Sequence, residues 1–523
     1  MITSLTYIPG GAVKMELDGK DLTVKQLTQF ARTKEKIEFT ERAKQRMQKS
    51  RDFVEKMFRE GIPAYGTTTG IGELASILLT PAQAKELSKY MVYSHASGYG
   101  EALPEEVVRA TIATRLNVLA KGISGVRIEV AEFIAEMLNR GVVPVMYPAS
   151  VGACGDLAPL AQAMLVPLGK GEAFYQGERL PGRRALELVG LEPIEYQIRD
   201  GLAVINGSQL IAGLASLEVS DADTLIKSAE IVATLSFEAL KAVTLAFDDE
   251  ILRLRGFSGG IKCATNIRKM IAGSTILGKQ ERVQDAYSIR STPQVLGTVK
   301  DCLDYVKKQV EIEINSGADN PLFVPKENGN GRYLTGANFQ GTPVALPLEM
   351  LGMGVTTVAV ISERRLNRLT NSNLNIGLPG FLIEGAGLYT GIMIPQYTAA
   401  SLICENRILC TPAAIGSIPT AADQEDFVSM GTNTALKTRK IVDNAFAVIA
   451  IELLAAAQAV DLRIKKEGGK LGKGTQAAYD VVRKWVKFLD EDRPLYPDIE
   501  KLKLVVQNGE LLMAVEEAVG GLE

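Results

Sequence analysis

Two long stretches of apolar, helix-forming residues constrain the fold of this chain more than any other feature of its sequence. Pro343–Arg368 and Asn433–Leu462 are each about 25 to 30 residues long, so at about 1.5 Å of rise per residue each could span a domain. Because both are apolar on most faces, they have to be buried among other helices. The sequence therefore predicts a mainly α-helical protein with a bundle of long helices.

Shorter segments show the same helical pattern earlier in the chain. Glu106–Leu119 places its apolar residues at helical spacing behind Pro104, and Ile128–Leu138 repeats the pattern. Strand signals are sparse. We expect a loop-rich N-terminal domain over residues 1–200, followed by the long-helix bundle and C-terminal helices over residues 201–523.

Charge, cysteine and histidine content exclude several classes of protein. The net charge is -3 and no basic tract is present, so we expect no nucleic-acid partner. The five cysteines form no C-x-x-C pair, which argues against a disulfide framework and against a metal site. His95 is the single histidine, which excludes multi-histidine metal sites and leaves one imidazole for any hydrolytic triad.

The sequence predicts neither export nor a membrane span. Met1–Leu22 lacks the basic start and apolar run of a signal peptide. The longest apolar stretch, Phe446–Val460, is interrupted by Glu452 and Gln458 and is shorter than the roughly 20 residues that a bilayer requires. We interpret it as a buried helix, and we expect a cytoplasmic protein with no membrane partner.

Four segments rich in Gly, Pro, Asn or Ser interrupt the helical pattern. Loops held on a rigid helical scaffold are the usual place for binding and catalysis. We therefore expect the chemistry to lie in Tyr65–Gly72, Tyr147–Gly155, Gln284–Gln294 and Asn315–Gln340.

The segment Ala149–Leu160 packs small residues into a turn that opens an apolar helix. One interpretation is a glycine-rich turn capped by Asp156, since Asp is a favoured N-cap. The segment also resembles the signature of the histidine, phenylalanine and tyrosine ammonia-lyases and the related aminomutases. These enzymes cyclise Ala-Ser-Gly into 4-methylideneimidazol-5-one (MIO). The resemblance implies an MIO group formed autocatalytically from Ala153, Cys154 and Gly155.

The chemistry of this cyclisation explains the residue types. The Gly nitrogen attacks the Ala carbonyl, which requires a backbone tight enough that bulky side chains would obstruct it. The central residue then eliminates its β-substituent and leaves an exocyclic methylene. Cys154 departs from the family, which usually has Ser, but a thiol can leave as sulfide just as a hydroxyl leaves as water. The alternatives are a packed small thiol or a chain that never matures.

The other motifs of this family follow in order along nearly the whole chain. Examples are Tyr65-Gly66-Thr67-Thr68-Thr69-Gly70, Asn206-Gly207 and Gln284-Asp285-Ala286-Tyr287-Ser288-Ile289-Arg290. Besides the tripeptide, the resemblance implies four catalytic residues: Tyr65, Asn206, Tyr287 and Glu425. It implies substrate contacts from Gly72, His95, Gln284, Arg290, Phe339 and Gln340.

The resemblance also implies a role for each main residue. The MIO methylene would capture the substrate amine and make it a better leaving group. Tyr65 would remove the β-proton, which requires a positive local potential because a tyrosine with a pKa near 10 is a weak base. Arg290 would bind the substrate carboxylate with two N–H groups of its planar guanidinium, and Glu425 would control the protonation state of the substrate amine.

Each of these residues has a plainer interpretation as well. Tyr65 could be a turn residue, Arg290 a surface ion pair and Glu425 part of a helix-capping cluster. Gln284 and Tyr287 would share a face if their segment were helical, although Pro293 favours a loop equally.

Different motifs in the sequence favour different substrates. Ser94-His95 matches the position where histidine lyases carry Ser-His, whereas Asn338-Phe339-Gln340-Gly341 is more similar to the phenylalanine group and Thr68–Glu73 to tyrosine aminomutases. We favour ammonia elimination from L-tyrosine or L-phenylalanine, giving the unsaturated acid. The alternatives are a 2,3-aminomutase giving a β-amino acid, a histidine ammonia-lyase giving urocanate, and an inactive helical scaffold or amino-acid-binding relative.

The family also implies an assembly. Its members form homotetramers whose active sites combine several subunits, so Tyr65, Tyr287 and Glu425 need not come from one chain. The uniformly apolar long helices agree with this expectation, since one chain has limited surface to cover them.

Overall fold

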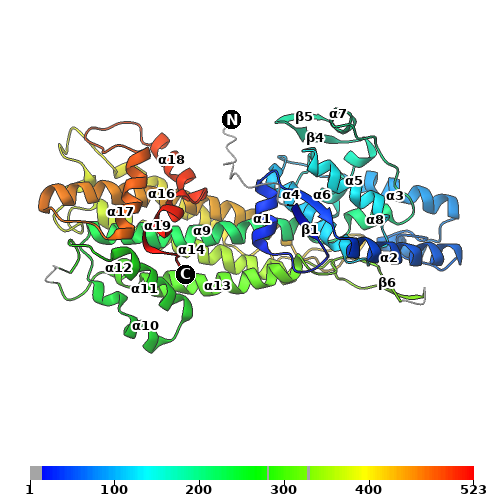
Figure 1. Ribbon diagram of the computed structural model, residues 1–523, viewed down its shortest axis with the longest axis horizontal. Helices are drawn as coiled ribbons and strands as arrows, with labels where there is room; N and C mark the ends of the chain where they lie inside the picture. The colour runs from blue at the N-terminus through cyan, green and yellow to red at the C-terminus, as the bar shows by residue number, and fades with distance from the viewer. Residues whose placement is uncertain (1–13, 279–281, 327–329) are drawn as a thin grey trace. The chain divides into compact units, whose positions relative to one another are not determined.

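The computed structural model describes residues 14–278, 282–326 and 330–523 (Figure 1). The chain forms two compact units. The first contains the described residues up to Ser220, together with Val306–Glu349 and Pro412–Leu436. The second contains Asp221–Tyr305, Met350–Thr411 and Lys437–Glu523.

Four long helices contribute residues to both units, so four of the five passages of the chain between the units lie inside helices. These are α9 (Gln209–Ala239), α13 (Thr292–Glu313), α14 (Thr342–Thr370) and α16 (Gly431–Glu467). The helices predicted over Pro343–Arg368 and Asn433–Leu462 are confirmed as α14 and α16. The mainly α-helical fold is confirmed too.

The length and apolar composition of α14 and α16 alone would allow either to cross a membrane. However, 67% of the most apolar window of α14 and 89% of that of α16 is buried within the chain. Core helices of globular proteins show this combination. The buried helix predicted around Phe446–Val460 is therefore confirmed within α16.

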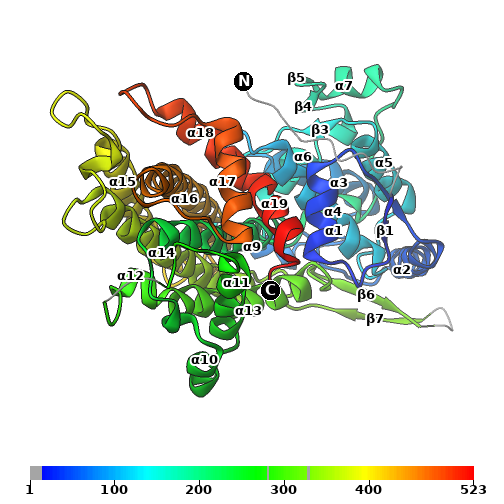
Figure 2. The ribbon, with the colours of Figure 1, turned by 60° about the vertical axis from the view of Figure 1, so that its left-hand side comes forward.

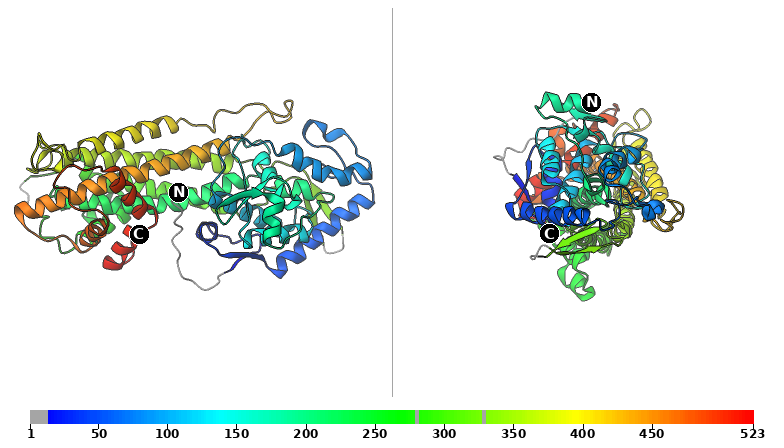
Figure 3. Two further views of the ribbon diagram at one scale, coloured as in Figure 1. Left: turned by 90° about the horizontal axis from the view of Figure 1, so that it is seen from above. Right: turned by 90° about the vertical axis from the view of Figure 1, so that its right-hand side faces the viewer.

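Three of these helices share a buried polar contact in the second unit. Glu452 of α16 accepts hydrogen bonds from Ser236 of α9 (2.8 Å) and Ser362 of α14 (2.6 Å). Its two oxygens also accept from Nε and Nη2 of Arg365 at 2.6 and 2.8 Å, and both side chains are fully buried. Figure 3 shows the second-unit parts of these helices running alongside one another in green, yellow-green and orange. Glu452, which interrupts the apolar stretch in the sequence, thus joins three helices.

The first unit surrounds its core with shorter helices. The predictions over Glu106–Leu119 and Ile128–Leu138 are confirmed as α4 and α5, within a residue or so at each end. The helices of this unit that lie outside the four long ones are α1 (Val24–Arg32), α2 (Glu41–Arg59), η1 (Gly72–Ser76), α3 (Pro81–His95), α4 (Glu105–Ala120), α5 (Ile128–Asn139), α6 (Leu157–Ala163), η2 (Val166–Leu168), α7 (Gly182–Leu188) and α8 (Asp200–Ile205).

The second unit adds helices around its share of the long ones. They are η3 (Thr244–Phe247), α10 (Asp249–Arg255), α11 (Ser258–Ile271), α12 (Tyr287–Arg290), η4 (Gly380–Leu382), α15 (Met393–Leu409), α17 (Lys473–Trp485), α18 (Tyr496–Gln507) and α19 (Glu510–Val519).

Strands are short and belong to the first unit. β1 (Lys14–Leu17) pairs in parallel with β2 (Lys36–Phe39), with Lys14 opposite Lys36. β3 (Val143–Pro144), β4 (Glu172–Tyr175) and β5 (Glu178–Pro181) form an antiparallel sheet, and β6 (Leu322–Pro325) pairs antiparallel with β7 (Gly331–Leu334). The sparse strand signals agree with this small strand content.

Two of the predicted loops contain regular structure. Gln284–Gln294 includes α12 and the start of α13, and Asn315–Gln340 includes the β6–β7 hairpin (Figure 2). Neither segment is a continuous loop, and of the two alternatives left open for Gln284 and Tyr287, Tyr287 lies in a helix and Gln284 in the loop before it. Elements of four residues are too short to show periodicity, and tertiary packing stabilises them.

The hairpin packs on α2. Phe323 of β6 is fully buried with Val54 and Met57 of α2, and Tyr333 of β7 packs against the same cluster. The rings of Phe323 and Tyr333 lie 5.6 Å apart. This packing fixes the hairpin beside the loop that begins at Tyr65.

Candidate active site

The Ala153-Cys154-Gly155 turn lies between β3 and α6 and is too crowded for a larger residue at its end. Gly155 has φ +68° and forms a β-bridge with Gly207. A Cβ on Gly155 would lie 2.1 Å from the carbonyl carbon of Gly207, so only glycine fits. The turn therefore has the small-residue backbone that cyclisation of this tripeptide requires.

The turn is anchored from the distant segment before α16. The backbone N–H of Met430 donates to the carbonyl of Val151 (2.8 Å), and the Ser429 hydroxyl donates to the carbonyl of Gly152 (3.1 Å). On the local side, the Ser150 hydroxyl accepts from the N–H of Gly152 (3.0 Å). The residues that lead into the tripeptide are thereby held in place.

Asp156 follows the tripeptide and links it to α9 and α16. It occupies the N-cap position of α6, but its side chain makes no capping bond there. Instead the carboxylate accepts from the Thr432 hydroxyl (2.5 Å) and the N–H of Ile211 (3.0 Å). The interpretation of Asp156 as a cap of its own helix is therefore wrong. Complete burial raises its pKa to about 6, although these hydrogen bonds act in the opposite direction.

Glu425 meets the tripeptide directly. The Cys154 thiol donates to Oε1 of Glu425 at 2.8 Å, and the Thr420 hydroxyl donates to Oε2 at 2.8 Å. Thr420 is not among the residues predicted from the sequence, where its only signal is that it follows Pro419 in a turn-like run. The interpretation of Glu425 as a residue of a helix-capping cluster is not supported by these partners.

The loop that presents Glu425 is strained. Ala421, Ala422 and Asp423 have φ values of +50°, +53° and +66°, in the left-handed region that non-glycine residues avoid. Backbone bonds between Thr420 and Glu425 close the loop in both directions. Strain of this kind, held in place by surrounding structure, clusters at functional sites.

Cys154 is a thiol in this environment. Burial raises its pKa well above the ordinary value, and the hydrogen bond to the Glu425 carboxylate adds to the effect. The sulfur therefore keeps its proton at neutral pH.

Tyr65 lies within electrostatic range of both groups. Its phenolic oxygen accepts from the N–H of Gly72 at 2.9 Å. Burial raises its pKa, as do the nearby Cys154 and Glu425, whereas the Gly72 N–H and Arg199 lower it. Gly72, predicted as a substrate contact, instead donates to the predicted base.

Asn206 lies at the C-terminal end of α8, beside Gly207. Its amide nitrogen donates to Oδ1 of Asp319 (3.1 Å) and to the carbonyl of Asn320 (2.7 Å). Arg115 donates to its backbone carbonyl at 2.6 Å. These bonds orient the side chain, and Gly207, the second residue of the Asn206-Gly207 motif, connects it to the tripeptide.

The remaining predicted residues of the first unit have local partners. His95 ends α3 and is partly exposed, and its Nδ1 lies 2.7 Å from the carbonyl of Met91. Because a carbonyl only accepts, the neutral ring carries its proton on Nδ1 and presents Nε2 as an acceptor. Gln340 accepts from the N–H and hydroxyl of Thr342 (3.0 and 2.9 Å) at the start of α14, and the neighbouring Phe339 is partly buried.

Gln284, Tyr287 and Arg290 belong to the second unit. Tyr287 and Arg290 share α12, with the guanidinium 4.7 Å from the ring centroid of Tyr287. Tyr287 is 72% exposed. Within the described residues, the buried Nε of Arg290 has no hydrogen-bond partner. The predicted carboxylate-binding residues are thus in a different unit from Tyr65, Cys154 and Glu425.

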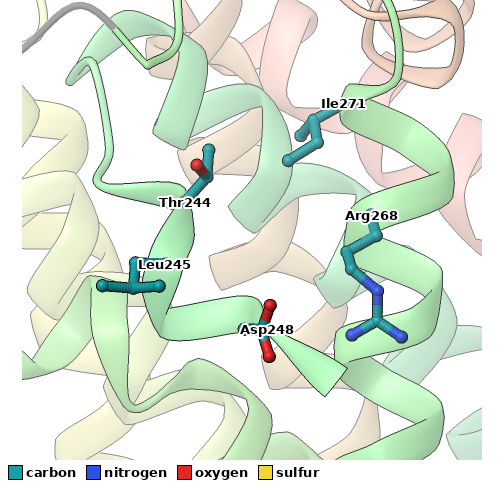
Figure 4. Close-up of a pocket in the computed structure, with 5 residues that line it drawn as sticks. All are labelled: Thr244, Leu245, Asp248, Arg268 and Ile271. Carbon is teal, nitrogen blue, oxygen red and sulfur yellow. The ribbon is translucent and has the colours of Figure 1, made fainter. Parts of the chain in front are cut away.

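A cavity of about 380 Å³ also lies in the second unit (Figure 4). Thr244, Leu245, Asp248, Arg268 and Ile271 line it. The Arg268 guanidinium already donates to the Asp249 carboxylate (2.9 Å) and to the carbonyl of Phe247 (2.7 Å). This cavity contains none of the predicted site residues.

Comparisons with known proteins agree with the arrangement. A model of the aromatic amino acid lyase family matches residues 22–484. The chain is 45% identical over 507 residues to the histidine ammonia-lyase of Caldanaerobacter subterraneus subsp. tengcongensis, and the alignment covers 96% of this chain and 98% of that relative.

Solved structures give the same result at the level of the fold. The tyrosine aminomutase of Streptomyces globisporus matches with a TM-score of 0.93 and 34% identity, over 98% of this chain and 100% of that one. Histidine ammonia-lyase of Trypanosoma cruzi matches with a TM-score of 0.90 and 34% identity, over 97% and 96% of the two chains. The chain is a carbon–nitrogen lyase or a related aminomutase with the ammonia-lyase fold, and it belongs to the aromatic amino acid lyase family.

Proposed function

We propose that this chain is a histidine ammonia-lyase, which eliminates ammonia from L-histidine to give urocanate. Relatives that are 41 to 45% identical over nearly their whole length carry that name. They do not support the preference for tyrosine or phenylalanine drawn from the sequence. His95 suits an imidazole substrate, because its Nε2 acceptor can take the N–H of a second imidazole.

The observation that carries the proposal is the hydrogen bond between Cys154 and Glu425 at the glycine-restricted turn. It brings the tripeptide and an acidic residue into contact in one unit, within electrostatic range of the tyrosine proposed as the base. This combination is what β-elimination from an amino acid requires: an electrophile for the amine, a group that controls its protonation, and a base.

The residues present fit an MIO group derived from Ala153, Cys154 and Gly155. The Gly155 nitrogen would attack the Ala153 carbonyl carbon, and water would leave. Loss of the Cα proton of Cys154 would then expel the protonated sulfur as HS⁻, which takes up a proton to become hydrogen sulfide. Retention of the thiol proton favours this step, because a dianionic sulfide is a far poorer leaving group. When formed, MIO would supply a methylene electrophile for the substrate amine.

The chain's own residues would perform the remaining steps. Tyr65 removes the β-proton, and Glu425 holds a proton at the amine. Arg290 binds the substrate carboxylate through its planar guanidinium, whose Nε has no other partner among the described residues. We propose that a neighbouring copy in a homotetramer supplies Arg290 together with Gln284 and Tyr287.

Intact-mass spectrometry tests the maturation step. The purified chain is expected to be lighter than its sequence by one water and one hydrogen sulfide, with near-ultraviolet absorbance that borohydride removes. Cys154→Ser should show the same final mass, because a hydroxyl leaves as water. Cys154→Ala has no β-substituent to eliminate and should therefore lack the chromophore. A wild-type chain of unaltered mass contradicts the proposal.

The substrate is tested by incubation with histidine, tyrosine and phenylalanine separately. Urocanate from histidine, with slower or no turnover of the other two, is the expected result. Formation of cinnamate or coumarate alone would show that the relatives' specificity does not extend to this chain.

An aminomutase is the second candidate, favoured by the TM-score of 0.93 to a tyrosine aminomutase. A mutase uses the same site but retains the product until ammonia returns at the β-carbon. Resolving β-amino acids from unsaturated acids in the same incubations separates the two activities. We further propose a cytoplasmic location, with residues 1–200 forming the MIO group and residues 201–523 the helical bundle.

A further inference from the structure

A buried arginine, Arg199, interacts electrostatically with Tyr65. Arg199 precedes α8, and its side chain is fully buried. Its Nε donates to the carbonyl of Ser124 (2.8 Å), and its Nη2 donates to Oδ1 of Asp319 (3.2 Å) and to the carbonyl of Pro321 (3.2 Å). Within the described residues its Nη1 is buried with no hydrogen-bond partner. The guanidinium therefore has an unused donor in a dry environment.

The charge around Arg199 is not balanced. Asp319 accepts from both Arg199 and Arg115, and all three side chains are almost completely buried. Two guanidiniums thus share one carboxylate, and Asp319 also accepts the amide of Asn206, which carries no charge. A net positive charge remains in a region of low dielectric constant, where it acts over a longer range than in water.

A short chain of contacts connects this charge with Tyr65. The guanidinium of Arg199 stacks 5.3 Å from the ring centroid of Phe323, whose ring packs on Tyr333. The phenolic oxygen of Tyr333 accepts the backbone N–H of Tyr65 at 2.8 Å. Arg199 also interacts electrostatically with both tyrosine hydroxyls.

We propose that Arg199 is a positioning residue for the base: its incompletely neutralised guanidinium supplies the positive potential that favours the phenolate form of Tyr65. This rests on the proposed function, in which Tyr65 removes the β-proton. It identifies a source for the positive potential that a tyrosine base requires.

The other groups around Tyr65 make such a cation necessary. Burial and the Glu425 carboxylate oppose ionisation of the Tyr65 hydroxyl, as does the Cys154 sulfur until it leaves. The favourable contributions come from the Gly72 N–H and from Arg199. Without the cation, the neutral dipole of one backbone N–H would have to offset a carboxylate and the loss of hydration.

The experiment compares Arg199→Gln, which removes the charge, with Arg199→Lys, which retains it. Arg199 has φ +72°, a left-handed conformation. Both substitutions keep an ordinary L side chain there, so they should change the backbone strain equally little. Asp319 keeps Arg115 (2.9 Å) and Asn206 (3.1 Å) as partners, so no carboxylate is left unpaired.

Arg109→Gln is the matched control. Arg109 is also buried in the first unit, donates to the backbone carbonyls of Phe30 and Ala31, and stacks 4.4 Å from the ring of Phe30. It has the same kind of structural role, but Tyr65 is not among the groups that affect its pKa.

Two measurements report on the Tyr65 hydroxyl. The first is kcat/KM against pH, which rises as the base ionises. The second needs no turnover: the phenolate absorbance of each protein is titrated, and the titration of the same protein with Tyr65→Phe is subtracted. Thermal unfolding and near-ultraviolet absorbance confirm that each variant is folded and carries its chromophore.

In Arg199→Gln the acidic limb of the kcat/KM profile and the subtracted titration should both move to higher pH by about half a unit, with about a threefold loss of activity at neutral pH and recovery at high pH. Arg199→Lys and Arg109→Gln should titrate like the wild type. An unshifted titration in a folded Arg199→Gln protein overturns the inference. If the wild type turns over no amino acid, the proposed function fails, and the subtracted titration still decides whether Arg199 favours the phenolate.

Discussion

At the scale of single residues, Tyr65 illustrates how position decides chemistry. A tyrosine in a glycine-rich loop is usually a turn residue, yet here its hydroxyl lies in range of Cys154 and Glu425 and accepts from Gly72. The residue type came from the sequence, whereas its surroundings came from segments far away in the chain.

Replacing Tyr65 by Phe should abolish turnover while the MIO chromophore persists. The change removes the base and leaves the tripeptide untouched, so the loss should amount to about a hundredfold or more in kcat. Steady-state kinetics together with the near-ultraviolet spectrum checks this. Retention of most activity would refute the assignment of Tyr65 as the base.

Asp156 should make stability depend on pH in a defined direction. Its folded pKa of about 6 exceeds its ordinary value of 3.8, so between these values the folded chain binds more protons than the unfolded chain. Stability contributed by this group is therefore present below about pH 4 and lost as the pH rises through about 6.

Urea unfolding of the wild type and Asp156→Asn over this range checks the sign. The difference in free energy of unfolding between the two should change by up to about 3 kcal/mol from pH 4 to pH 7, in favour of the variant at the higher pH. A difference that does not vary with pH would contradict the raised pKa.

At the scale of elements, the length of a helix or strand decided whether it could be predicted from the sequence. α4, α5, α14 and α16 follow from apolar periodicity, which is a local property. The β6–β7 hairpin and α12 do not, because each spans only four residues per element and depends on partners elsewhere. Phe323, for example, needs the apolar face of α2.

The buried contact around Glu452 gives a prediction at this scale. Arg365→Met should destabilise the chain by about 3 to 5 kcal/mol, because it leaves the Glu452 carboxylate buried without its cation. Lys465→Met is the control: Lys465 and its partner Glu384 are 64% and 62% exposed, so the cost should stay within about 0.5 kcal/mol. Denaturant midpoints of the two variants measure the difference, and equal midpoints would argue against the buried pair.

At the scale of the whole molecule, the predicted site residues are distributed over two units. Tyr65, Cys154, Asn206 and Glu425 belong to the first, and Gln284, Tyr287 and Arg290 to the second. We propose that copies of the chain complete one another's sites in a homotetramer.

Co-expression of two inactive chains tests this proposal. If Tyr65 and Arg290 of one site come from different subunits, mixing Tyr65→Phe with Arg290→Met should restore about a quarter of the wild-type activity, because random assembly gives that share of sites both native residues. If both residues came from one chain, no site would be restored. Mixing the separately purified proteins without exchange of subunits serves as the control.

The sequence alone determined the long helices, the residue types of the tripeptide and the order of the family's motifs, because hydrophobic periodicity and residue identity can be read from short segments of the chain. Tertiary structure alone decided that Glu425 contacts Cys154 across 271 positions and that Arg115 and Arg199 share Asp319. It also replaced the local cap expected of Asp156 with bonds to Thr432 and Ile211. Such contacts depend on how distant segments pack, and no short window of residues encodes that packing.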